Sequence, residues 1–303
     1  MDGDRLLIVA AGVLGFDDVR YTFDEAVERS GVRPDLARRY WRALGFPDPP
    51  ADVPSLGERD IEALRLATRF LAGPESEENS VAQARAICAA LARVAETWCD
   101  TLRRLHTAGL AWDDIAGFLP AEFEGGRIAT ILDYVHSRLL LAGIRREVEA
   151  ERAGEGGNEL AIAFVDLVGW TELTRTLDAG ELGRLVVTFE GTAYDAVVDG
   201  GGRFVKLIGD EVMFTAPTVD AAVAIARRLL DPSSGLPPCR AGVAAGPVVR
   251  YEGDVFGPPV NLASRIVELA DPGTVVVDRE VAGTAPLGLR AVKGVGDVRL
   301  WRA

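Results

Sequence analysis

The stretch that decides the fold of the C-terminal half is RFVKLIGDEVMFTAP, residues 203–217. Its two short apolar runs flank Gly209-Asp210, and this pattern predicts a β-hairpin with Asp210 at its tip. The run ELAIAFVDLVGW, residues 159–170, predicts a strand that ends at Asp166. We therefore expect two carboxylates at adjacent strand ends, exposed to solvent, where they could hold a pair of Mg²⁺ ions.

The segments around this hairpin alternate between strand-like and helix-like patterns. Helices are predicted at residues 178–200, 219–230 and 260–270, and a further strand at 239–249. The order β-α-ββ-α-β predicts a ferredoxin-like α+β domain. GTVVVD and LRAVKGVGDVRLWRA then predict closing strands at the C-terminus.

The N-terminal half has a different character, because its apolar residues recur with helical spacing and strand patterns are absent. Thr22 before an acidic turn predicts a helix cap. The apolar run from Leu6 is too short to span a bilayer and predicts a buried helix. The expected organisation is an all-helical regulatory and dimerisation domain at 1–151, a Gly-rich linker at 152–158 and a catalytic domain at 159–303.

Composition limits the classes of function. The 303 residues carry a net charge of −13, which argues against a broad nucleic-acid or anionic-membrane surface. Three cysteines without metal-ligand spacing indicate reduced thiols and a cytoplasmic protein. Of the 33 basic residues only two are lysines, Lys206 and Lys293, and Lys206 lies four positions before Asp210.

A second polar motif follows in DVFGPPVNLASRI, residues 254–266. Asp254 is expected in a loop. Asn261 and Arg265 are four residues apart at the start of a helix and therefore share one face. That face either is merely solvated or binds a phosphate or ribose near the helix N-terminus.

The three motifs FVDLVGWT, VKLIGDEVMF and DVFGPPVNLASR, in this order and at this spacing, resemble the class III nucleotidyl cyclase catalytic domain over about residues 158–303. The resemblance implies that Asp166 and Asp210 bind two metal ions, Mg²⁺ or Mn²⁺, with the carbonyl of Leu167. It also implies that Asn261 and Arg265 orient the ribose and stabilise charge on the α-phosphate in the transition state.

The same resemblance implies further substrate contacts. Lys293 would contact the β- and γ-phosphates. Backbone N–H groups would hold phosphate oxygens at Leu167, Val168, Gly169, Trp170 and Thr171.

The remaining pair, Lys206 and Asp254, matches the positions that select the base. A compact point donor such as lysine suits adenine N1, and a carboxylate accepts from the adenine amine. A shifted guanine could also present O6 to the lysine and N1–H to the carboxylate. The donor–acceptor pattern therefore favours ATP without excluding GTP.

The resemblance has a consequence for assembly. In the family the active site lies between two catalytic domains, of which one supplies the metal aspartates and the other the base-selecting pair, Asn and Arg. This chain carries both sets in one such domain. We therefore expect a homodimer with two equivalent shared sites, formed through the catalytic and N-terminal domains.

The first 150 residues resemble the helical regulatory domain of some actinobacterial soluble adenylyl cyclases, which is associated with autoinhibition and a pH response. The resemblance rests on TFDEAVERSGV and DLARRYWRALGFPDP. The same stretch resembles a MerR-type helix-turn-helix, in which Arg38, Arg39 and Arg42 could face phosphate. The acidic composition argues against DNA binding.

The only two histidines, His106 and His136, lie in this domain. Because histidine titrates near neutral pH, they are candidates for a pH switch, and a buried histidine without a sensing role is the alternative. His136 is the stronger candidate, since its helix leads into the linker.

Together these features predict an adenylate cyclase that converts ATP to 3′,5′-cyclic AMP and pyrophosphate, regulated by its N-terminal domain. The alternatives are a guanylate cyclase, or a non-catalytic nucleotide or DNA sensor that uses the MerR-like helices.

Overall fold

The computed structural model describes residues 3–70, 77–123, 126–152 and 159–303. The chain forms two compact units, Met1–Ile144 and Arg145–Ala303. The predicted linker at 152–158 lies outside the described residues from position 153 onward.

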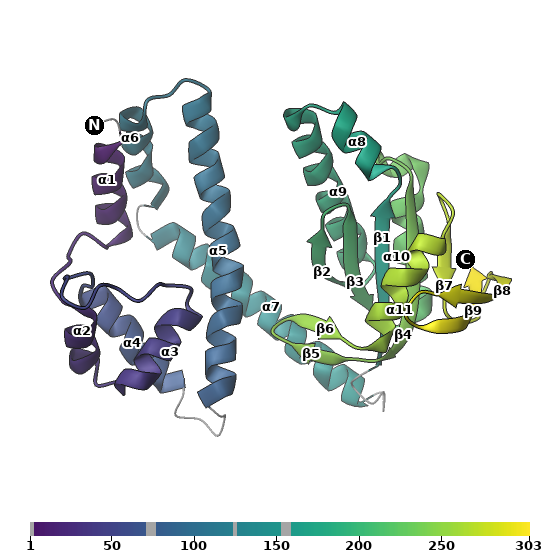
Figure 1. The fold of residues 1–303 in the computed structure, drawn as a ribbon, viewed down its shortest axis with the longest axis horizontal. Helices are drawn as coiled ribbons and strands as arrows, with labels where there is room; N and C mark the ends of the chain where they lie inside the picture. Colours follow the sequence, from purple (N-terminus) through teal and green to yellow (C-terminus); the bar gives the residue numbers. More distant parts are fainter. Residues whose placement is uncertain (1–2, 71–76, 124–125, 153–158) are drawn as a thin grey trace. The chain divides into compact units, whose positions relative to one another are not determined.

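Helices dominate the first unit, as the sequence predicts (Figure 1). They are α1 (Asp4–Leu14), α2 (Phe23–Ser30), α3 (Pro34–Ala43), α4 (Glu58–Phe70), α5 (Glu77–Thr107), α6 (Trp112–Phe123) and the first part of α7 (Arg127–Arg152). Thr22 caps α2 as expected, in a reciprocal pair with Glu25. Among the described residues of this unit, the only β-pairing is the isolated bridge between Tyr21 and Leu56.

The burial predicted for the first helix is wrong. Helix α1 forms where the apolar run predicts it and packs against α6. None of its residues is buried, and Leu7 and Ile8 are 71% and 72% exposed. The reason is that apolar residues surround the whole helix, so one neighbouring helix covers only part of its circumference.

The second unit is built on one seven-stranded sheet with the order β2-β3-β1-β4-β7-β9-β8. The strands are β1 (Glu159–Leu167), β2 (Arg203–Ile208), β3 (Glu211–Ala216), β4 (Cys239–Pro247), β7 (Val275–Val277), β8 (Ala285–Val292) and β9 (Gly296–Arg302). The four strands β4-β1-β3-β2 pair antiparallel in the order expected for a ferredoxin-like fold, which confirms the predicted class.

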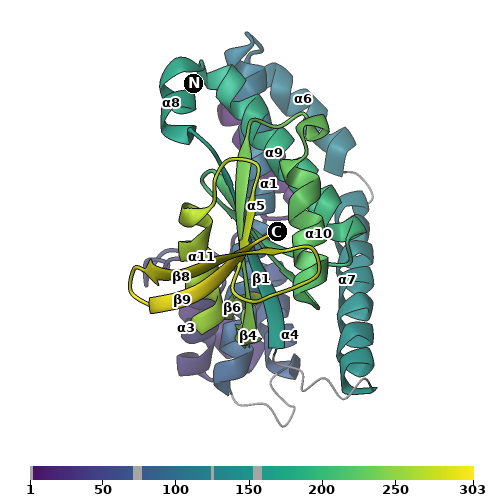
Figure 2. The same ribbon diagram turned by 90° about the vertical axis from the view of Figure 1, so that its right-hand side faces the viewer.

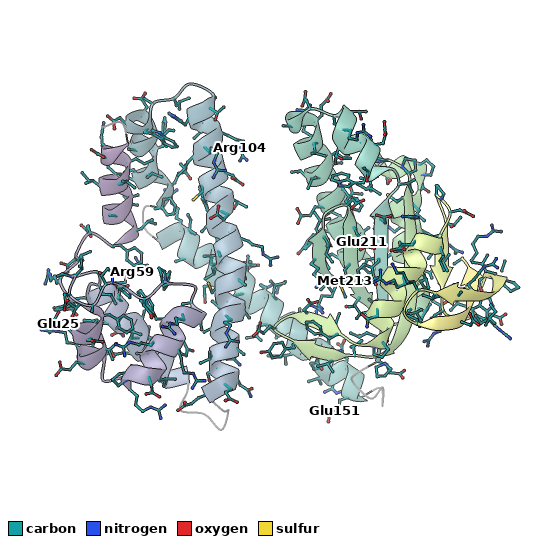
Figure 3. The ribbon with its side chains drawn as sticks, in the orientation of Figure 1. Glu25, Arg59, Arg104, Glu151, Glu211 and Met213 are labelled. Carbon is teal, nitrogen blue, oxygen red and sulfur yellow. The ribbon has the colours of Figure 1, made fainter. Side chains whose placement is uncertain are left out.

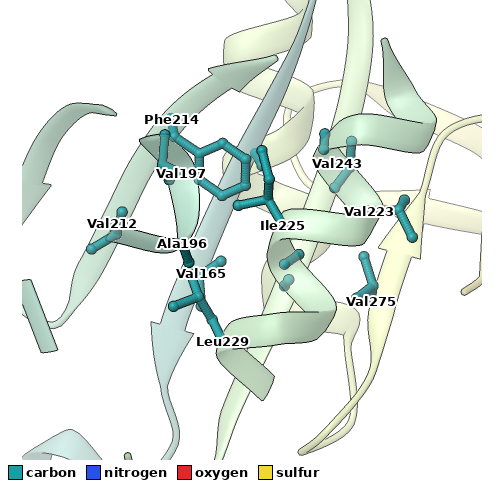
Figure 4. Packing of buried hydrophobic residues seen from close by; sticks show 14 of the residues in the cluster. Val165, Ala196, Val197, Val212, Phe214, Val223, Ile225, Leu229, Val243 and Val275 are labelled. Carbon is teal, nitrogen blue, oxygen red and sulfur yellow. The ribbon is translucent and has the colours of Figure 1, made fainter. Parts of the chain in front are cut away.

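Two hydrophobic cores cover the opposite faces of this sheet. Helices α9 (Ala179–Asp199) and α10 (Val219–Leu230) pack on one face, where Phe214 and Ile225 are among the buried residues (Figure 4). Helix α11 (Pro258–Ile266) packs on the other face with Phe164 and Met213 (Figure 2). Alternate residues of β1 and β3 therefore belong to different cores.

Short elements complete the second unit. Helix α8 (Trp170–Thr176) follows β1, and the 3₁₀ turns Pro232–Ser234 and Val267–Leu269 follow α10 and α11. Strands β5 (Val249–Tyr251) and β6 (Asp254–Phe256) form a separate two-stranded ribbon. Asp254 is thus the first residue of a strand, and its predicted loop position is wrong. Within the described ranges, no helix combines the length and apolar character needed to cross a bilayer.

Candidate active site

The candidate site residues lie on the face of the sheet that α11 covers. Asp166 pairs in register with Glu211, and each is two residues from a side chain of the α11 core, Phe164 and Met213 respectively. Side chains two apart on a strand point to the same face. The hairpin turn at Gly209-Asp210 joins β2 to β3 as predicted, next to the end of β1.

A β-bulge in β2 decides where Lys206 points. Phe204 pairs with Phe214, but Lys206 pairs with Met213, so Val205 is an extra residue in β2. Without the bulge, Lys206 would lie opposite Val212 and face the core under α9 and α10. The extra residue turns Lys206 to the α11 face, where the other polar residues gather.

The two predicted metal aspartates lie side by side. The Leu167 N–H donates to the carbonyl oxygen of Asp210 over 3.1 Å, which ties the end of β1 to the hairpin tip. Burial raises the pKa of the Asp210 carboxyl, and the charge and hydrogen bond of Asp166 raise it further. The expectation that both carboxylates are exposed is wrong, since the Asp166 side chain is 15% exposed and Asp210 is half-buried.

Arg240, at the start of β4, holds the Asp166 carboxylate. Its Nε and Nη2 atoms each lie 2.7 Å from Oδ2 of Asp166, and its Nη1 donates to the carbonyl oxygen of Glu268 over 3.3 Å. Arg240 was not among the site residues predicted from the sequence. The only indication in the sequence was a basic residue at the start of a predicted strand, and this strand pairs with the strand that carries Asp166.

Glu211 is a third acidic group here and was also missed (Figure 3). Its burial raises its pKa to about 7, and the charges of Asp166, Asp210 and Glu268 add to the shift. The nearby Arg240 lowers this pKa and so partly offsets the effect. The cluster therefore carries an excess of negative charge, which a bound cation would relieve.

These groups surround a polar cavity of about 290 Å³. Its lining comprises Asp166, Ile208, Asp210, Glu211, Arg240, Ser264, Arg265, Val267 and Glu268. Arg265 therefore lines the same cavity as the aspartates of its own chain, and its Nη1 lies 3.7 Å from Oε1 of Glu268. The predicted base-selecting residues do not belong to this lining.

The donor set fits a divalent cation. Two neighbouring carboxylates of like charge are hard oxygen ligands of the kind that Mg²⁺ and Mn²⁺ take. Across the described ranges, no group of three or more His, Cys, Asp or Glu side chains is arranged to hold a metal ion. A metal held by Asp166 and Asp210 would thus need the backbone carbonyl of Leu167 and substrate or water oxygens to complete its ligands.

The predicted base-selecting residues form an ion pair. Lys206 Nζ donates to Oδ2 of Asp254, and Oδ1 of Asp254 accepts the N–H of Val255 over 2.8 Å. The two side chains are 36% and 26% exposed, so both remain accessible to a ligand. The structure thus brings together two residues that are 48 positions apart in the sequence.

Helix α11 carries the two residues predicted to act on the ribose and α-phosphate. Asn261 and Arg265 are both exposed on it. The helix lies close to β4 because Gly242 has no side chain: a Cβ there would approach the backbone N of Val267 to 2.5 Å. Lys293 is exposed in the turn between β8 and β9.

The predicted phosphate-binding amides differ in availability. The Leu167 N–H is engaged by Asp210, as described above. The Val168 N–H donates to the carbonyl oxygen of Pro238 over 2.8 Å. In this conformation neither amide is a phosphate donor, which restricts the hypothesis to the amides of Gly169, Trp170 and Thr171.

The first unit bears on the DNA-binding alternative. Arg38 pairs with Asp24, Arg39 with Glu77 and Arg42 with Asp48. All three arginines that could face nucleic-acid phosphate thus form ion pairs within the protein, and these pairs are exposed to solvent.

Comparison with known proteins decides the family. An adenylate cyclase of Streptomyces coelicolor is 37% identical over 288 residues, covering 92% of this chain and 75% of the relative. The chain belongs to the adenylate cyclase family. The resemblance seen in the sequence motifs is confirmed at this level.

Two further relatives also match most of the chain. An adenylate cyclase of Streptomyces griseus is 39% identical over 91% of this chain and 71% of the relative. A Mycobacterium tuberculosis protein named as a pH-sensitive adenylate cyclase is 34% identical over 98% of this chain and 81% of the relative. No protein-family model matches the chain.

Proposed function

We propose that this member of the adenylate cyclase family converts ATP to 3′,5′-cyclic AMP and pyrophosphate. The observation that carries the proposal is the grouping of Asp166 and Asp210 at one cavity, with Lys206 and Asp254 paired on the same face of the sheet. Family membership and the names of the relatives support the same reaction.

The chain's own residues have distinct parts in the proposed mechanism. Asp166 and Asp210, with the carbonyl of Leu167, would hold two divalent metal ions, which would lower the pKa of the ribose 3′-OH and neutralise charge on the triphosphate. Lys206 donates to adenine N1, and Asp254 accepts from the adenine amine. Arg265 stabilises charge on the α-phosphate in the transition state, while Asn261 orients the ribose.

Incubation with ATP or GTP and Mn²⁺ or Mg²⁺, with quantification of the cyclic products, tests this proposal. We expect cyclic AMP from ATP at the higher rate. Predominant cyclic GMP would favour the guanylate cyclase alternative. The absence of any cyclic nucleotide under all four conditions would favour a non-catalytic nucleotide sensor.

We further propose that two copies of the chain share each active site. One protomer would supply the metal aspartates, and its partner the base-selecting pair, Asn261 and Arg265. Within one chain, the base-selecting pair and the metal aspartates do not line one cavity, and a single nucleotide must reach both. A twofold arrangement would give two equivalent sites.

Subunit mixing tests this arrangement. The Asp166→Ala and Lys206→Ala proteins should each be nearly inactive, and mixing under exchange should restore about a quarter of wild-type activity, because half the dimers are mixed and each has one intact site. A monomeric active protein would contradict the proposal. Mixing Asp166→Ala with Arg265→Ala then shows whether Arg265 serves the partner's aspartates, since recovery fails if it serves its own.

Finally, we propose that the N-terminal unit inhibits catalysis and that protonation of His136 relieves the inhibition at mildly acidic pH. His136 is exposed on α7. His106 instead donates from Nδ1 to the carbonyl oxygen of Leu110 over 2.9 Å and stacks on Trp112, which favours a structural role. The pH-sensitive relative supports a response of this kind.

The test compares wild type, His136→Ala and His106→Ala as full-length proteins between about pH 5.5 and 8. We expect only the His136 variant to lose the activation at low pH. If that variant retains the wild-type profile and the His106 variant does not, His106 is the sensor.

A further inference from the structure

Arg203 links the strand of Lys206 to the hairpin of Asp254. It is the first residue of β2, and its Nη1 donates to the carbonyl oxygen of Gly253 over 2.7 Å. Gly253 immediately precedes Asp254, while Arg203 lies three positions before Lys206. Two neighbouring contacts therefore join β2 to this hairpin, one to the backbone of the turn and one to the carboxylate.

The bulge at Val205 makes this double contact possible. In a regular strand, side chains three positions apart point to opposite faces. Here Arg203 pairs with Thr215 and Lys206 with Met213, and these partners are two residues apart on β3. Both cations therefore lie on the α11 face. The bulge aligns Arg203 with Lys206 as well as turning Lys206 towards the site.

The hairpin that carries Asp254 has little support of its own. Strands β5 and β6 have three residues each, and a two-stranded ribbon is marginally stable by itself. Its turn residues Glu252 and Gly253 both have positive φ angles, 49° and 78°, as in a type I′ turn. The position of Asp254 relative to Lys206 therefore depends on contacts from outside the ribbon, which include the burial of Val255 in the core under α11 as well as the contacts from β2.

The surroundings of Arg203 are consistent with a fixed role. Burial lowers the pKa of its guanidinium, and the nearby cations Arg250 and Arg146 lower it further, while Asp254 opposes the shift. A guanidinium that is half-buried among other cations is costly to maintain unless its hydrogen bonds compensate. The hydrogen bond to Gly253 supplies one such compensation.

We propose that Arg203 is a positioning residue for base selection, which holds Gly253 and thereby Asp254 at the separation from Lys206 that suits the edge of adenine. The inference rests on the proposed base-selecting role of Lys206 and Asp254. When a base enters between these two side chains, their direct ion pair must open. The hydrogen bond from Arg203 to Gly253 does not involve the groups that contact the base, so it continues to hold the hairpin.

The test measures kcat/KM for ATP and for GTP in Arg203→Met and Arg203→Lys. Met keeps an apolar side chain of similar length but has no donor. We expect the ratio of kcat/KM for ATP to that for GTP to fall about tenfold, mainly because KM for ATP rises. Lys offers a single donor nitrogen in place of a planar guanidinium, so we expect the ratio of kcat/KM for ATP to that for GTP to fall about threefold. Arg228→Met, which removes an ion pair with Asp199 on the surface of α9 and α10, is the matched control.

An unchanged ratio, with or without an equal loss of kcat/KM for both nucleotides, would overturn the inference. A residue with only a structural role would affect both substrates alike. If the Met variant does not fold, the Lys variant decides by the same criterion. Lys206→Ala and Asp254→Ala are measured alongside. If neither changes the ratio, the base-selecting assignment itself is wrong. If both lower it and Arg203→Met does not, only the role of Arg203 is wrong.

Discussion

The β2–β3 hairpin carries two regions with different electrostatics: an acidic end at its turn, and a region around Lys206 in the middle of β2, called the base end. At the acidic end, around the turn, the carboxylates of Asp166, Asp210, Glu211 and Glu268 outnumber the cations Arg240 and Arg265. At the base end, Lys206 and Asp254 balance each other in one ion pair, and the neighbouring charges around Arg203 include the cations Arg250 and Arg146. An excess of buried negative charge favours a divalent cation, whereas a balanced donor–acceptor pair suits the uncharged edge of a base.

The largest effect should come from the acidic end. Asp166→Asn and Asp210→Asn keep the side-chain shape and replace a charged carboxylate ligand with a neutral amide oxygen, so we expect activity to fall by at least about 10³-fold. Mn²⁺ binding, followed by electron paramagnetic resonance, should weaken in parallel. Asp199→Asn, on the surface of α9, is the control. Near-normal activity with Mg²⁺ in either variant would mean that the acidic end does not hold the metal.

These substitutions are preferable to Ala because the aspartates are less exposed than the sequence suggests. Removing the Asp166 carboxylate also leaves Arg240 without the partner that its Nε and Nη2 contact. Part of any effect of Asp166→Ala would therefore be a loss of stability. Thermal unfolding of Asp166→Asn and Asp166→Ala, measured without metal, separates this loss of stability from the loss of metal binding.

A smaller effect is expected at Arg265, which lines the cavity of the acidic end. Arg265→Ala should lower kcat by about 10²-fold and change KM much less, because the guanidinium acts mainly on charge that develops in the transition state. Arg227→Ala on α10 is a matched control on the opposite face of the sheet. A rise in KM with unchanged kcat would show that Arg265 only binds substrate.

Glu211 allows the charge excess to be measured without catalysis. Its pKa is raised in the folded protein to about 7, so its protonated form stabilises the fold at low pH and that stability is lost as the pH rises through 7. In EDTA, Glu211→Gln should therefore unfold a few degrees above wild type near pH 8, with little difference near pH 4.5. Adding Mn²⁺ should reduce the difference in unfolding temperature near pH 8, because the cation offsets the negative charge of the ionised Glu211.

The control for this experiment is Glu190→Gln, an exposed position on α9. If wild type and Glu211→Gln respond to pH in the same way, the acidic end does not carry the excess charge inferred from its geometry. The contrast with the base end would then have no electrostatic basis.

Much of the fold around these two regions could be predicted from the sequence. The alternating apolar runs predicted the strands, the Gly-Asp turn predicted the hairpin, and the three motifs indicated the family. These features depend on local patterns that the chain displays directly. The assignments of individual site residues remain predictions.

What the sequence did not reveal depends on register and on contacts between distant segments. The bulge at Val205 leaves no pattern, because its neighbours are ordinary strand residues. The three-residue strand at Asp254 is too short for a periodic pattern. Arg240 and Glu211 gain their significance only from the pairing of β1 with β3 and β4.

The smallest effect is expected where the last turns of α7 meet the base end. Glu147 forms an ion pair with Arg250 on β5, and the two side chains are 62% and 39% exposed. Exposed pairs of this kind contribute about 0–1 kcal/mol and are screened by salt. We therefore expect Glu147→Gln to lower kcat/KM for ATP by less than about threefold at low salt, and by less still at high salt. The Mn²⁺ affinity of the acidic end should not change.

A loss of tenfold or more in kcat/KM for ATP would show that α7 controls the position of the β5–β6 hairpin through this pair. The base end would then be held by the helix as well as by β2. Exchanging the two charges, with Glu147→Arg and Arg250→Glu together, should then restore the activity lost in either single variant.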